Sequence, residues 1–172
     1  MSLAAERCKF LLKNSWLTFG EACAMANHLR KQIRDAAVAA LTGLATTGAN
    51  VFPSRVYELQ DADLPALKVD TNEESVQIDS MGGAARVVSR ALNLIVHACV
   101  KQNATYNDTI DQIIKEVEVA IAANQSLGGA KYVQLTGIAI EMAGEGEKPV
   151  AVATMTFEVP YFSALNAPDV AL

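Results

Sequence analysis

The strongest constraint on the fold lies near the end of the chain, where apolar and polar side chains alternate through residues 150–161. Successive side chains of a β-strand point to opposite faces, so this alternation predicts a long strand with one buried and one exposed face. The predicted buried face consists of Ala151, Ala153, Met155, Phe157, Val159 and Tyr161, opposite Thr154, Thr156 and Glu158. Such a strand needs a second layer of structure over its apolar face alone.

Two amphipathic helices can supply that layer. Residues 29–44 carry apolar side chains at helical spacing and charged side chains on the other face. Asn27 can cap this helix, and a Thr-Thr-Gly group ending at Gly48 can stop it. Residues 106–124 repeat the pattern with an isoleucine-rich stripe, and Asp108 or the asparagine before it can act as the cap.

Further strands are predicted on both sides of the second helix. Residues 84–101 fit both a helix and a strand, but their β-branched side chains favour the strand. Leu67 and Val69 alternate with charged neighbours and predict a shorter strand. Residues 132–143 are predicted to pair with the final strand as a hairpin, in which Gly137 marks a change of apolar phase and predicts a β-bulge.

The order of these segments predicts an α+β fold. We expect one mostly antiparallel or mixed sheet of about four to five strands, packed on one face by two main helices, in the order α-β-β-(β)-β-α-β-β. The strand in parentheses is a weaker alternation at Val76 and Ile78. This single domain is predicted to span residues 25–162. Residues 163–172 carry Pro168 and no periodicity, so we expect them to form an extended tail.

Residues 1–24 differ from the rest of the chain and allow two interpretations. Their apolar side chains could form one helical stripe that packs on the domain, although no cap or turn joins this stripe to the helix predicted from residue 29. Alternatively, Met25 is the natural start, because the codons of Gly20 and Glu21 can spell a ribosome-binding sequence shortly before it. The apolar side chains concerned are Phe10, Leu11, Leu12, Trp16, Leu17 and Phe19.

Composition disfavours several classes of protein. The 172 residues include 14 Lys and Arg against 19 Asp and Glu, a formal net charge of -5, which argues against a nucleic-acid clamp. No apolar run reaches the roughly 18 residues of a membrane-spanning helix. The three cysteines form an odd set without C-x-x-C spacing, so we expect reduced thiols and no disulfide framework or zinc cluster.

We identify no catalytic set in the sequence. His28 and His97 lie on different predicted elements, and the chain has neither a nucleophile elbow nor a phosphate-binding glycine loop. Residues 61–74 are rich in Asp and Glu but lack EF-hand spacing, which favours a solvated loop over a cation site. The residues therefore offer no candidate catalytic, cofactor-binding or metal-binding set.

Three short motifs occur in a characteristic order. A helix of the form Leu-Arg-x-x-Ile-x-x-Ala-x-x-x-Ala-Leu begins at Leu29, and residues 47–52 (TGANVF) and 61–69 (DADLPALKV) come after it. A long strand, a helix and a hairpin ending in aromatic residues come next. In this order, residues 27–162 resemble the tail terminator family of long-tailed phages, which includes the minor tail protein U of phage lambda.

The resemblance implies a structural protein of the virion tail that is not an enzyme, needs no cofactor and is assembled in the cytoplasm of the bacterial host. It would form a homohexameric ring on the last ring of tail-tube protein, stop tail polymerisation and present the joining surface to the head–tail connector protein. An alternative is another ring-forming neck or tail-completion protein of a phage-like particle or prophage. A more distant alternative is an α+β module that binds a small ligand.

In a ring, Asp61 and Asp63 would lie at a subunit boundary and face basic side chains of a neighbour. Exposed ion pairs contribute only about 0–1 kcal/mol each, so they would set the register more than the stability. We also expect residues 71–86, 144–148 and 163–172 to project as contact arms. The basic interface candidates are Arg30, Arg34, Arg55 and Lys68.

Overall fold

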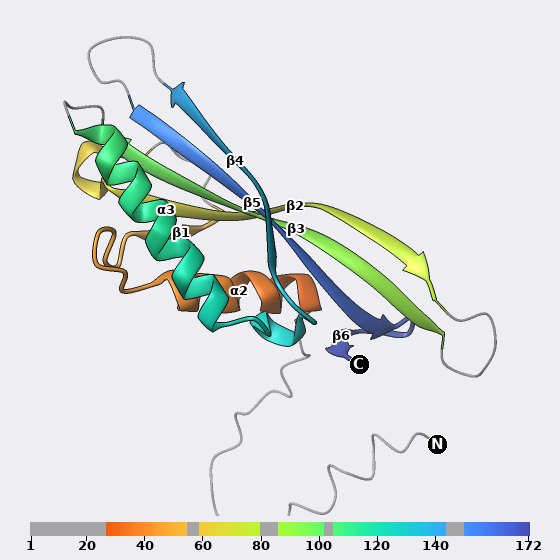
Figure 1. Ribbon diagram of the computed structural model, residues 1–172. Coiled ribbons are helices and arrows are strands. Elements are labelled where there is room, and N and C mark those ends of the chain that lie inside the picture. Colours follow the sequence, from red (N-terminus) through yellow and green to blue (C-terminus); the bar gives the residue numbers. More distant parts are fainter. Residues whose placement is uncertain (1–26, 55–58, 80–85, 102–104, 144–149) are drawn as a thin grey trace, which may run out of the picture.

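Long antiparallel strands form the centre of this molecule (Figure 1). The computed structural model describes residues 27–54, 59–79, 86–101, 105–143 and 150–172. The described residues form one six-stranded mixed sheet with two α-helices on one of its faces. This arrangement confirms the predicted α+β fold, with one strand more than expected.

The strand order is β1-β2-β3-β5-β4, and β6 pairs with β5 off this path. Strands β1 and β2 run parallel, whereas every other pair is antiparallel. The bulge expected at Gly137 is confirmed by a register shift between Leu135 and Gly137. The strands are β1 (Val51–Pro53), β2 (Ala66–Ile78), β3 (Val87–Lys101), β4 (Gln134–Ala143), β5 (Val150–Ala164) and β6 (Ala167–Ala171).

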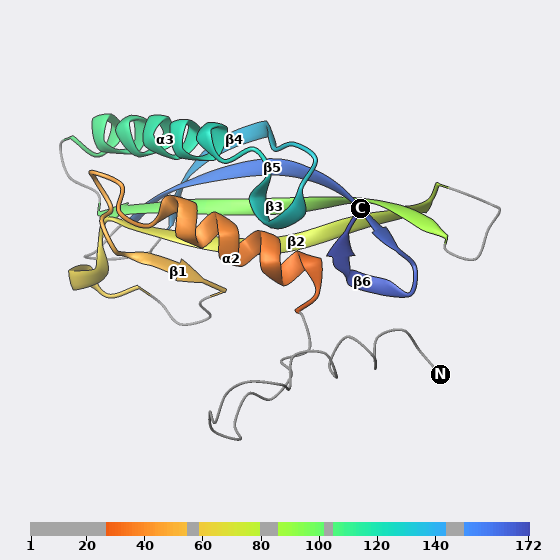
Figure 2. The ribbon, with the colours of Figure 1, turned by 90° about the horizontal axis from the view of Figure 1, so that it is seen from below.

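Helices α2 (Leu29–Leu41) and α3 (Tyr106–Ala123) lie on the same face of the sheet (Figure 2). Short 3-10 helices, η1 (Asp61–Asp63) and η2 (Leu127–Gly129), precede β2 and follow α3. Both predicted caps are wrong by one residue or more. The N-cap of α2 is His28, whose Nδ1 accepts a hydrogen bond of 3.1 Å from the backbone N–H of Arg30, and the N-cap of α3 is Thr105.

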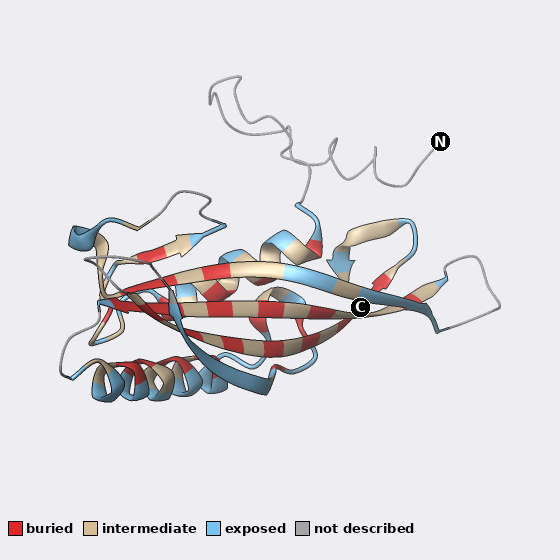
Figure 3. Cartoon of the chain, turned by 90° about the horizontal axis from the view of Figure 1, so that it is seen from above, coloured by how far each residue is buried: buried red, intermediate tan, exposed pale blue. Residues whose placement is uncertain are grey.

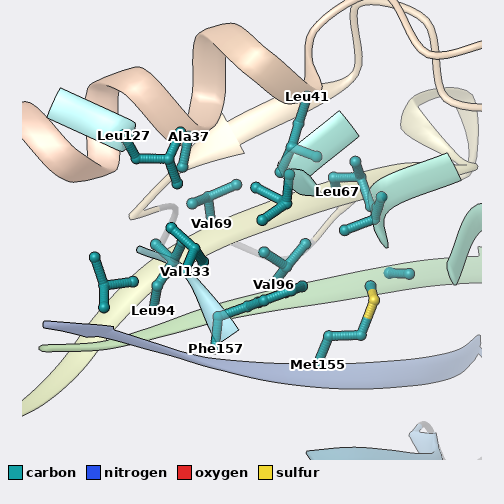
Figure 4. Packing of buried hydrophobic residues seen from close by; sticks show 14 of the residues in the cluster. Ala37, Leu41, Leu67, Val69, Leu94, Val96, Leu127, Val133, Met155 and Phe157 are labelled. Carbon is teal, nitrogen blue, oxygen red and sulfur yellow. The ribbon is translucent and has the colours of Figure 1, made fainter. Parts of the chain in front are cut away.

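The core lies between the helices and one face of the sheet. Every second residue of β5 is buried, as the alternation predicts, and β3 shows the same period (Figure 3). Leu94 of β3 lies opposite Phe157 of β5, and Val96 lies opposite Met155. These four side chains pack with Ala37 and Leu41 of α2 and with Leu67 and Val69 of β2 (Figure 4). Burial of one large aliphatic or aromatic side chain contributes about 1.5–3 kcal/mol.

The two halves of β2 are joined by a bulge that α2 stabilises. The register between β2 and β3 shifts between Thr71 and Glu74, so Val76 and Ile78 continue β2 and do not form a separate strand. The guanidinium of Arg30 donates to the carbonyl oxygens of Thr71 and Asn72, both at 2.8 Å. These bonds satisfy carbonyl groups that the irregular ladder leaves without a strand partner.

The expectation that residues 163–172 project from the domain is wrong. Ser163 is fully buried at the end of β5, and the chain then turns back as β6. The side-chain amide of Gln32 on α2 donates to the carbonyl oxygen of Asp169 at 2.8 Å, and the backbone N–H of Leu172 donates to Phe162 at 3.1 Å. Residues 71–78 belong to strand β2 and most of their side chains are exposed, so their role as a contact arm stays a prediction, while residues 80–85 and 144–148 lie outside the described residues.

The contact between η2 and α2 yields a prediction with an internal control. Gly48 and Gly128 both have φ +56°, but a Cβ at Gly128 would lie 2.8 Å from the backbone of Gln32, whereas a Cβ at Gly48 would meet nothing within 4 Å. We expect Gly48→Ala to lower the free energy of unfolding by about 1 kcal/mol, because of the left-handed backbone strain alone. Gly128→Ala should lower the free energy of unfolding by about 1–3 kcal/mol more, because the added Cβ forces α2 and η2 apart. Urea unfolding of both variants measures this difference, and equal costs would contradict the close contact.

Candidate assembly surfaces

Strand β4 forms one edge of the sheet and exposes a row of large apolar side chains. Ile138, Ile140 and Met142 have 42%, 49% and 52% of their surface exposed. They lie opposite Met155, Ala153 and Ala151 of β5, which are fully buried on the face that carries the helices. We call Ile138, Ile140 and Met142 the β4 row.

The β4 row is exposed because no helix packs over it. Helix α3 packs against β3 and β5, so the core face continues onto β4 without its cover (Figures 1 and 3). The row was not predicted as a surface from the sequence. Its alternation with Ala139 and Glu141 is typical of a half-buried strand, and nothing in this local pattern says that the apolar side would be left open.

The two sheet edges differ in their protection. Natural proteins shield exposed edges with very short strands, prolines or charged side chains. Strand β1 has three residues and ends at Pro53, and the part of β2 beyond it carries a bulge and the charged Glu73 and Glu74, so this edge fits the rule. Strand β4 has ten residues, and Glu141 is its one charged side chain. The unshielded edge is therefore the one that carries the β4 row.

The structure gives most of the charged interface candidates partners within the subunit. Asp61 pairs with Lys101 at 3.2 Å, and the carboxylate of Asp63 accepts a hydrogen bond of 3.3 Å from the backbone of Gln60 at the start of η1. Lys68 pairs with Asp70 at 3.3 Å. Their assignment to a subunit boundary stays a prediction, but these charges also have roles inside the chain.

The remaining candidates are basic residues in and after α2. Arg30 donates hydrogen bonds to the β2 bulge, and Arg55 lies outside the described residues. The Nε of Arg34 is buried, and the described part of the chain offers it no hydrogen-bond partner. Within the subunit Arg30 bonds to the β2 bulge and Lys68 to Asp70, and their pairing with Asp61 or Asp63 of a neighbouring copy stays a prediction.

The face of the sheet opposite the helices carries a row of polar side chains. Lys68, His97 and Thr154 lie side by side in register on β2, β3 and β5. The Nδ1 of His97 lies 3.0 Å from the hydroxyl of Thr154. Burial and the nearby Lys68 lower the pKa of His97, and Asp70 opposes this shift. A neutral imidazole held by a hydroxyl group is typical of a structural histidine.

The described residues do not assemble a metal site or an activated nucleophile. None of their His, Cys, Asp and Glu side chains form a group of three or more that could hold a metal ion. Burial raises the pKa of the Cys99 thiol, which disfavours the thiolate needed for nucleophilic chemistry. Within the same part of the chain, no helix is long and apolar enough to cross a membrane.

A polar network covers the core face near the far end of β2. Glu74 accepts hydrogen bonds from the guanidinium of Arg90, at 3.2 Å, and from the hydroxyl of Tyr161. The Nε of Arg90 also donates to Ser163 at 3.2 Å. The side chains of Arg90 and Glu74 are only 13% and 11% exposed. Their mutual bonds compensate for the loss of hydration that burial of two charges requires.

Comparison with protein-family models finds no match to this chain, and comparison with curated proteins finds none either. The function is therefore inferred from the surfaces described above.

The polar network predicts a pH dependence of stability. Burial, the hydrogen bond to Glu74 and the charge of Glu74 raise the pKa of Tyr161. The protonated phenol therefore stabilises the fold fully below about pH 10, the ordinary tyrosine pKa, and this contribution is lost above it at up to about 1.4 kcal/mol per pH unit. Tyr161→Phe should flatten the fall in unfolding free energy between pH 9 and 11 in urea titrations. Tyr132→Phe, at a 43% exposed side chain, is the control and should keep the wild-type slope.

Proposed function

We propose that this chain is a structural protein of a phage virion that closes the tail tube as a ring of six copies. In this role it ends tail polymerisation and presents the surface that joins the tail to the head connector. The number of subunits and the partners follow from the resemblance to tail terminators. The contact between copies follows from the β4 row.

The observation that carries the proposal is an unshielded edge strand with an apolar row beside its free backbone groups. The free N–H and C=O groups of an edge strand can pair with another chain, and the row adds apolar area to that contact. A ring needs a heterologous interface, in which one patch of each subunit binds a different patch of the next. The two edges of this sheet differ in length and chemistry, which supports such an arrangement.

The proposal predicts that the β4 row controls assembly. Ile138→Lys combined with Ile140→Lys should abolish rings, because two apolar contacts worth about 1.5 kcal/mol each weaken the subunit affinity by about 100-fold. Mass photometry and negative-stain microscopy of the full chain measure the rings, and circular dichroism checks that the variant is folded. Ile138→Lys alone can be compared with Ala139→Lys, which places the same single charge on the opposite face of β4 and should leave the rings intact.

Purified tail tubes provide the second measurement. Wild-type rings should cap one end of the tubes and prevent their further growth, and the double variant should not. A protein that stays monomeric at high concentration would contradict the proposal. Rings that do not bind tail tubes would instead indicate another ring-forming protein of the neck.

A further inference from the structure

A groove with small side chains runs along the boundary between α2 and α3. One hollow of about 380 Å³ lies between Ala36, Ala39 and Ala40 of α2 and the turn that contains Leu127. A second hollow of about 280 Å³ lies between Leu44 and Ala120, beside Val119. The two hollows follow one another in opposite chain order along α2 and α3, because the two helices run antiparallel. We call them together the helix groove.

The helix groove is mostly apolar, with Asn124 and Ser126 as polar side chains in its first hollow, and one of its walls is fixed. Val119 has 64% of its surface exposed, the most among the large apolar side chains of the helices. Glu116 of α3 holds the segment after α2 in place, because its carboxylate accepts bonds from the backbone N–H of Thr46 at 3.0 Å and from its hydroxyl at 2.8 Å. Alanines on the α2 side leave the groove unfilled by the domain itself.

We propose that residues 7–19 of the same chain bind in the helix groove as an amphipathic helix. Leu12, Trp16 and Phe19 follow one another at intervals of four and three residues, so a helix would place them on one face. This inference favours the interpretation of residues 1–24 as an authentic part of the protein. It is independent of the ring proposed above.

Length and tethering agree with this occupant. From Leu12 to Phe19 a helix rises about 10 Å, and from Glu116 to Asn124 α3 rises about 12 Å. The connection of residues 20–28 can extend about 30 Å, whereas the distance along α2 from its start to Ala36 is about 10 Å. The segment can therefore reach the groove of its own subunit, running antiparallel to α2.

The single tryptophan of the chain makes the proposal directly measurable. Trp16 is that residue, so tryptophan fluorescence reports on residues 7–19 alone. At dilute concentration, the full chain should show blue-shifted tryptophan emission and weak quenching by acrylamide. Ala39→Arg combined with Val119→Arg should shift the emission to the red and raise the quenching constant several-fold, because long charged side chains fill the groove. Both positions are exposed, so the fold should persist, as circular dichroism can check.

Ala122→Arg is the matched control, because it adds the same charge to an exposed position of α3 that does not line the groove. It should leave the emission unchanged. Emission typical of exposed tryptophan in the wild-type chain would overturn the proposal, as would blue-shifted emission that the groove variant does not alter. A blue shift that appears only with rising protein concentration would assign the segment to another copy and would also overturn it. None of these outcomes depends on whether rings form.

Discussion

The pairing of β3 with β5 is the interaction on which the rest of the structure depends. Its antiparallel register runs without interruption from Val87 opposite Ala164 to Lys101 opposite Val150. Because side chains alternate along both strands, this register gathers the apolar residues of each strand on one shared face. Helices α2 and α3 pack on that face, and their positions follow from it (Figure 4).

The long apolar face is covered in more than one way. The helices bury its centre, and the network of Glu74, Arg90 and Tyr161 replaces apolar packing toward the far end with satisfied polar groups. At the β4 row the core face has no cover within the described residues. Exposed apolar surface beside an unpaired strand is unfavourable in an isolated subunit, so this region is where a partner stabilises the molecule most.

The charged candidates show why local sequence does not define such a site. Asp61, Lys68 and Arg30 are interface candidates because surface charges often set the register of an interface. In the folded chain they bond to Lys101, Asp70 and the β2 bulge. Asp70 lies two residues from Lys68, but Lys101 and the β2 bulge are distant in sequence from Asp61 and Arg30. These two become neighbours of their partners only through strand pairing and helix docking, so the sequence around Asp61 and Arg30 does not reveal their bonds.

Local periodicity determined the helices, the long strands and the bulge at Gly137, because amphipathic patterns depend only on neighbouring residues and on the need to bury one face. Tertiary structure decided which strands lie at the edges, and therefore that the β4 row is exposed while the equally apolar row of β5 is buried. It also decided that residues 167–171 join the sheet as β6, because the bond from Gln32 to Asp169 and the contact with η2 arise only after α2 has docked. Exposure of an apolar row is a property of the elements that pack over it, and their positions are set by residues far away in the sequence.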